Sequence, residues 1–172
     1  MITYSSALLF ISLLWLFARG AVIYKNRALD FKRELQLLLV YICIIVVLRF
    51  TFFPFGKVDG QIQPLIFTGG RPLRINLIPF VNLLDYSVFK EAMLNLIGNV
   101  TMFIPLGIVW PSVFKKLETH RQVIFAGVGT SLLIEILQLP FDRVTDVDDL
   151  ILNSAGFLVG YGIYLLFKRK KK

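Results

Sequence analysis

Five apolar segments, each about 20 residues long, follow one another along this chain of 172 residues. A helix rises 1.5 Å per residue, so a segment of that length spans the roughly 30 Å hydrocarbon layer of a bilayer. Inside a bilayer each backbone polar group needs a protein partner, which helices and closed barrels provide. The pattern therefore predicts an all-α, polytopic membrane helical bundle with about five transmembrane helices, at 4–24, 35–55, 92–114, 121–141 and 147–167.

The composition supports a membrane protein and limits the chemistry. The chain is 56% hydrophobic and its mean hydropathy is +0.72, well above a soluble domain. No Ser/Gly-rich linker divides it, so residues 1–172 are predicted to form one transmembrane domain. The lone Cys43 excludes an intramolecular disulfide and a thiolate metal cluster, and no metal or cofactor is predicted.

The positive charges predict the orientation of the chain in the membrane. The net charge of +8 would suggest nucleic acid in a soluble protein, but here the basic residues flank the apolar segments, so no nucleic-acid partner is expected. Basic residues gather at 25–33, at 115–121 and in the tail 168–172, and cytoplasmic ends carry such an excess. We therefore expect the amino terminus outside, the carboxyl terminus in the cytoplasm, and the links 56–91 and 142–146 outside.

Polar side chains interrupt the apolar segments mostly in their predicted outer halves. Gly127, Ser131, Glu135 and Gln138 are spaced four, four and three residues apart, which places them on one helical face. The last segment repeats this spacing with Asp149, Asn153, Gly156 and Gly160. Small residues let helix backbones approach closely in a bilayer. The third, fourth and fifth segments should therefore pack through these faces and enclose a polar pocket beneath the outer surface.

Each polar residue also has a structural interpretation. Asp146 or Asp148 could cap the last helix, since free amides at a helix start favour Asp. The amides of Asn95, Asn99 and Gln138 could simply hydrogen-bond across helices. Arg49 near an interface could be a snorkelling anchor instead of a ligand. Glu135 favours a functional interpretation, because a buried carboxylate needs a cation, a donor network or a proton; Arg143 or Arg49 is its expected partner.

Four sequence blocks carry a resemblance. NLIPF (76–80), GNVTMFIPLG (98–107), SLLIEILQL (131–139) and RVTDVDDLILNSAGFLVGY (143–161) are similar, in the same order, to the VanZ-like family of small bacterial membrane proteins. The resemblance implies a multi-pass protein of the bacterial cytoplasmic membrane. The family's namesake gives low-level resistance to the lipoglycopeptide teicoplanin without altering its peptide target. By motif, the positions of interest are Asn76, Pro79, Asn99, Pro105, Gly107, Glu135, Gln138, Arg143, Asp146, Asp149, Asn153 and Gly156.

Three functional classes stay open, and the sequence favours a binding protein over an enzyme. In the first, an outer-leaflet pocket binds or shields a lipid-linked envelope precursor, a lipoglycopeptide or another lipid-like ligand, with Arg71 and Arg74 also able to meet an anionic headgroup. In the second, a membrane enzyme uses Glu135 with Asp146 or Asp149 as a carboxylate pair. The third is a small transporter. Membrane lipids are expected partners, and the oligomeric state is left open. The predicted ligand-binding residues are Arg49, Asn76, Asn95, Asn99, Glu135, Gln138, Arg143, Asp146, Asp149 and Asn153.

Overall fold

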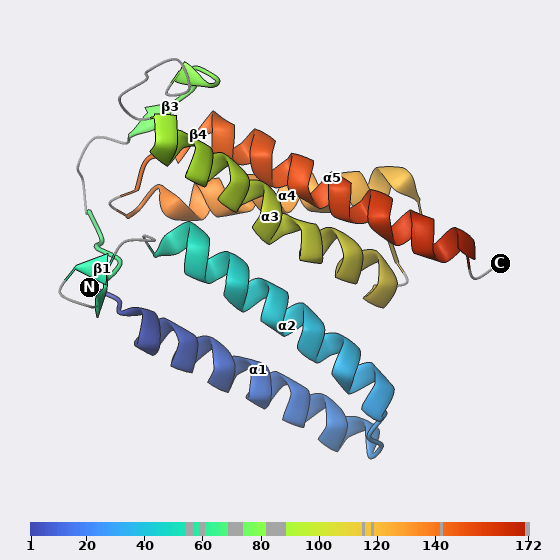
Figure 1. Ribbon diagram of the computed structural model, residues 1–172. Helices are drawn as coiled ribbons and strands as arrows, with labels where there is room; N and C mark the ends of the chain where they lie inside the picture. Colours follow the sequence, from blue (N-terminus) through green and yellow to red (C-terminus); the bar gives the residue numbers. More distant parts are fainter. Residues whose placement is uncertain are drawn as a thin grey trace. The chain divides into compact units, whose positions relative to one another are not determined.

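Helices account for most of the chain. The computed structural model describes residues 1–53, 57–58, 61–68, 74–81, 89–114, 116–117, 119–141 and 143–170. The predicted all-α fold class is confirmed (Figure 1). The described residues form five helices: α1 (Tyr4–Asn26), α2 (Phe31–Phe52), α3 (Phe89–Val113), α4 (His120–Gln138) and α5 (Val147–Lys170). Two-residue strands lie between them: β1 (Lys57–Val58), β2 (Gln61–Ile62), β3 (Ile75–Asn76) and β4 (Thr145–Asp146).

Four of these helices, α1, α2, α3 and α5, are long and apolar enough to cross a membrane by length and composition. The 19-residue helix α4 is not one of the four, because it begins with His120 and Arg121 and carries Glu135 and Gln138. The prediction of several membrane-spanning helices is thus confirmed. A fifth crossing by α4 and the orientation of the termini stay predictions.

Side chains fix the starts of the helices. Thr119 and Gln122 form a capping box at α4, in which each side chain satisfies a backbone N–H of the other residue. At α5 the Asp146 Oδ1 atom accepts a hydrogen bond from the Asp148 backbone N–H at 3.0 Å. Asp146 therefore has the predicted capping role, which also fixes the direction in which its second carboxylate oxygen points.

The chain forms two compact units, Met1–Ile66 and Phe67–Lys172. In the first unit, α1 and α2 lie side by side (Figure 1) and are joined by a bond of 2.5 Å between the Ser12 and Tyr41 hydroxyls. Nearer the turn between the two helices, Arg19 donates to Glu34, with 2.9 Å between Nε and Oε2. The antiparallel strands β1 and β2 belong to the same unit.

In the second unit the backbones of α3 and α5 approach closely. A Cβ atom added to Gly107 would lie 2.1 Å from the Phe157 carbonyl oxygen, and one added to Gly156 would lie 2.1 Å from the Val100 oxygen. Gly160 meets the Ile104 oxygen in the same way. The predicted close packing through the glycine face of the last segment is present, and α3 is its partner.

Helix α4 packs against α5 through its own small residues. A Cβ on Gly127 would lie 2.3 Å from the Phe157 ring, and the Ser131 hydroxyl donates to the Leu150 carbonyl oxygen at 3.4 Å. The two-residue strands β3 and β4 pair in parallel, Asn76 opposite Asp146, and so join the segment before α3 to the start of α5. This pairing and the helix faces bring polar residues to one end of the unit.

Replacing Gly156 with alanine should destabilise the protein, because the added methyl group would collide with the backbone of α3. Overpacking of this kind costs about 1–3 kcal/mol. We expect a lower unfolding temperature for the purified Gly156→Ala protein in detergent. Gly162→Ala is the matched control in the same helix, because nothing lies within 4 Å of that position. Equal unfolding temperatures of the two variants would contradict the close contact.

Candidate functional site

Most of the predicted site residues gather at one end of the second unit, where α3 begins, α4 ends and α5 begins. We call this group the polar cluster. It contains Asn76, Asn95, Asn99, Glu135, Gln138, Arg143, Asp146, Asp149 and Asn153. Four of its members are almost completely buried, with exposed fractions of 5% for Asn99, 4% for Glu135, 3% for Gln138 and 1% for Asn153. Buried polar groups need partners, so the hydrogen bonds decide what the cluster can do.

Asp149 joins α5 to α3. Its Oδ1 atom accepts a hydrogen bond from Asn95 Nδ2 at 3.1 Å and a second one from Asn99 Nδ2. The Asn99 amide also reaches the Asn95 Oδ1 atom at 3.4 Å. Two amide donors from successive turns of α3 therefore hold one carboxylate oxygen, and the short α3–α5 separation makes that reach possible.

Asp146 and Asp148 hold the segment that precedes α3. Asn76 Nδ2 donates to the Asp146 Oδ2 atom at 3.1 Å, while the other oxygen of Asp146 caps α5. Asp148 accepts a hydrogen bond of 2.8 Å from the Phe80 backbone N–H. Phe80 has a φ of 57°, a left-handed conformation that is uncommon for a residue with a side chain. These bonds make the start of α5 the anchor of this turn.

Glu135 is an incompletely satisfied member of the cluster, as is Asn153, whose buried Oδ1 atom has no hydrogen-bond partner among the described residues. The Asp146 backbone amide reaches its carboxylate, but its Oε2 atom has no hydrogen-bond partner among the described residues. Asp149, Asp146 and Arg143 all lie near enough to interact with it electrostatically. A buried acceptor without a donor loses its hydration and gains nothing in return, at a cost of about 1–3 kcal/mol.

Arg143, in the link between α4 and α5, supplies positive charge to the carboxylates. Burial lowers the pKa of its guanidinium from the usual value, whereas the charges of Asp149 and Glu135 raise it. Arg143 thus lies near enough to interact electrostatically with Glu135 and Asp149, and its role as the partner of Glu135 stays a prediction. The other arginines proposed to meet an anionic headgroup include Arg71, which lies outside the described residues.

A small pocket opens beside the cluster, between the start of α3 and the start of α5. Its volume is about 40 Å³, whereas pockets for drug-sized ligands measure roughly 300–1,000 Å³. It is lined by Phe80, Ala92, Asn95, Leu96, Asp146, Asp148 and Leu152. The space accommodates a group of a few atoms. No set of three or more His, Cys, Asp or Glu side chains in the described part of the chain is arranged to hold a metal ion.

Arg49 belongs to the first unit, where it interacts locally. Its guanidinium donates to the Phe53 carbonyl oxygen at 2.9 Å and lies 5.5 Å from the Tyr4 ring centroid and 5.4 Å from that of Phe50. Such cation–π contacts stabilise an arginine at the end of a helix. The local contacts favour the anchoring interpretation, and a ligand role for Arg49 stays a prediction.

Two residues beside the polar cluster, Asp148 and Phe80, were not among the predicted ligand-binding residues. Asp148 lines the pocket and holds the Phe80 turn, and Phe80 itself contributes its backbone N–H. Asp148 could have been included from its place among the aspartates that start the last segment. Nothing in the NLIPF block indicates that Phe80 is its partner, because the link between them depends on the short β3–β4 pairing.

The sequence profile of the VanZ/LLP1 family matches residues 38–168, and this range contains every residue of the polar cluster. Comparisons with curated proteins and with solved structures found no match. The matched range also covers the whole of α3 and most of α2 and α5, three helices that are long and apolar enough to cross a membrane. The chain therefore belongs to the VanZ/LLP1 family, as a helical membrane protein.

Proposed function

We propose that this protein lies in the bacterial cytoplasmic membrane and binds a lipid-linked or lipid-like ligand at the polar cluster, in the outer leaflet. Through that binding it lowers the sensitivity of the cell to lipoglycopeptides such as teicoplanin. The observation that carries the proposal is the buried Glu135 Oε2 atom, which lacks a donor among the described residues. A ligand that donates a hydrogen bond there removes the cost of that unsatisfied acceptor.

The surroundings of the pocket suit an amphiphilic ligand. The pocket is too small for a whole headgroup, so a small polar group enters while the rest stays outside. On α3, Leu94 and Ile97 flank Asn95 and are 63% and 55% exposed, which offers an apolar surface to an acyl chain. Carboxylates outnumber cations in the cluster, so the entering group is a hydrogen-bond donor such as a hydroxyl, an amide or an ammonium group.

The outer-leaflet placement rests on the distribution of basic residues. The end of the second unit opposite the cluster carries Arg121 and Lys168, near the basic link and the basic tail. Cytoplasmic ends of membrane helices carry such an excess of Lys and Arg. The cluster then faces outside, where lipoglycopeptides act on the cell envelope.

A membrane-embedded enzyme is the second candidate. The interaction between the Glu135 and Asp149 carboxylates favours it, because two nearby carboxylates in different surroundings can act as an acid and a base. A transporter is less compatible with the interior of the second unit. Beyond Asn153 the fully buried rings of Phe103 and Phe157 occupy part of that interior.

The variants Glu135→Gln and Asp149→Asn should abolish protection against teicoplanin. Each keeps the shape of the side chain while removing the charge and one acceptor oxygen, so membrane insertion should persist. The measurement is the minimum inhibitory concentration in cells with equal amounts of inserted protein, which should fall to that of cells lacking the protein. Glu34→Gln makes the same chemical change in the partly exposed pair with Arg19, and it should retain protection. Full protection by both cluster variants would refute the proposal.

Mass spectrometry of lipids should separate binding from catalysis. We expect a lipid to co-purify with the wild-type protein and to be reduced in Asp149→Asn, since that change weakens the amide bonds that shape the pocket. We also expect over-expression to leave the envelope lipid pool unchanged. A new or depleted lipid species that depends on Glu135 would instead favour the enzyme.

A further inference from the structure

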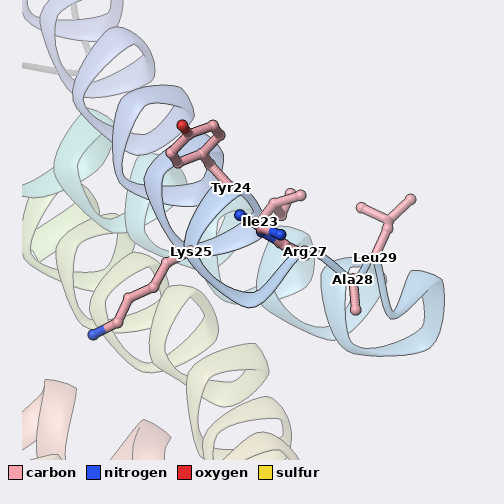
Figure 2. Close-up of a pocket in the computed structure, with 6 residues that line it drawn as sticks. All are labelled: Ile23, Tyr24, Lys25, Arg27, Ala28 and Leu29. Atoms are coloured by element: carbon pink, nitrogen blue, oxygen red, sulfur yellow. The ribbon is translucent and has the colours of Figure 1, made fainter.

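The turn between α1 and α2 forms a second and larger pocket, in the first unit. Figure 2 shows it, with a volume of about 560 Å³ and with Ile23, Tyr24, Lys25, Arg27, Ala28 and Leu29 as its lining. That volume lies within the range of roughly 300–1,000 Å³ that is typical of small-molecule sites. The Lys25 side chain extends away from the Arg27 side chain (Figure 2). The polar cluster contributes none of these residues.

Basic residues outnumber acidic ones around this turn. Both neighbouring acids are engaged: Glu34 pairs with Arg19, and the Asp30 Oδ1 atom caps α2 by accepting from the Arg33 backbone N–H at 3.1 Å. Within the described ranges, Lys25 and Arg27 form no ion pair. Arg27 is therefore available to an anion at the turn, with Lys25 adding to the positive charge of this end of the helix pair.

Arg27 occupies a position where glycine is usual. It is the C-cap of α1, with φ of 51° and ψ of 24°, and helices commonly end on glycine in this left-handed conformation. A residue with a Cβ is disfavoured there, whereas glycine is not. What arginine provides and glycine lacks is the guanidinium at the pocket, and a guanidinium binds a phosphate group through two parallel hydrogen bonds.

Apolar side chains surround the cations. Leu29 is 63% exposed and Phe31 is 75% exposed, while Tyr24 is 87% exposed. The turn joins two helices that are long and apolar enough to cross a membrane, so it lies at the level of lipid headgroups. A phosphate bound at Arg27 would thus have acyl chains beside Leu29 and Phe31, which favours a lipid phosphate over a free one.

We propose that the α1–α2 turn binds the headgroup of an anionic phospholipid, with its phosphate at Arg27 and its acyl chains along the apolar side chains of the turn, while Lys25 adds positive charge at the membrane surface. A basic residue near an anionic membrane surface contributes enough to change binding about fivefold. The site should therefore prefer phosphatidylglycerol over phosphatidylcholine, and each cation removed should reduce that preference by about fivefold.

The test measures lipid binding to the full-length protein in a neutral detergent, titrated with phosphatidylglycerol or phosphatidylcholine and followed by native mass spectrometry. Arg27→Gln and Lys25→Gln should each weaken phosphatidylglycerol binding. Arg27→Gly is the decisive variant, because it removes the charge and relieves the backbone together. It should bind phosphatidylglycerol more weakly while unfolding at the same or a higher temperature, a combination that a purely structural role of Arg27 does not give.

Lys116→Gln, in the link between α3 and α4, is the matched control and should leave the preference unchanged. Glu135→Gln should also leave it unchanged, so a failure here is distinct from a failure at the polar cluster. Equal binding of the two lipids by the wild-type protein would overturn the proposal. An Arg27→Gly protein that prefers phosphatidylglycerol as strongly as the wild-type protein would also overturn the proposal. If glycerol phosphate binds as tightly as the lipid, the acyl chains are not recognised, and the ligand of the turn is a soluble anion instead of a lipid.

Discussion

The close approach of α3 and α5 is the contact on which the polar cluster depends. Lipid tails are as apolar as leucine, so helices in a bilayer associate through packing and hydrogen bonds. Gly107 and Gly156 provide the packing, because a Cβ at either position would lie 2.1 Å from a carbonyl oxygen of the other helix. At that separation the short amides of Asn95 and Asn99 reach Asp149. The hydrogen bonds of the asparagines to Asp149 thus depend on the close approach that the glycines allow.

The polar cluster is a hydrogen-bonded network in which some buried oxygens, the Glu135 Oε2 and Asn153 Oδ1 atoms among them, have no partner in the described part of the chain. Asp149, Asp146 and Asp148 each accept hydrogen bonds that fix their orientation. Glu135 receives the Asp146 amide, while its Oε2 atom finds no donor in the described part of the chain. In a medium of low polarity such a group is costly, and the cost is released when a donor arrives. The hydrogen bonds hold the aspartates in place, and in the proposed function Glu135 is the position at which a ligand binds.

The sequence predicts the helices and their faces better than the contacts between segments. The spacing of Gly127, Ser131, Glu135 and Gln138 predicted one buried face, and all four are buried. The aspartates at 146 and 148 predicted a helix cap, which Asp146 provides. The β3–β4 pairing could not be predicted, since two residues are too few for a periodic pattern in the sequence. The hydrogen bond between Asp148 and Phe80, which follows this pairing along the chain, could not be predicted either. Local periodicity predicts which face of a helix is buried, whereas hydrogen-bond partners depend on how distant segments pack against one another.

The charges of the two sites imply ligands of opposite character. In the polar cluster, Arg143 lies among Glu135, Asp146 and Asp149, so a ligand must bring donors and not further negative charge. At the α1–α2 turn the acids are engaged by Arg19 and by the start of α2, so Lys25 and Arg27 attract an anion. The ligand proposed for the turn therefore carries a negative charge, whereas the ligand proposed for the cluster brings a hydrogen-bond donor to Glu135.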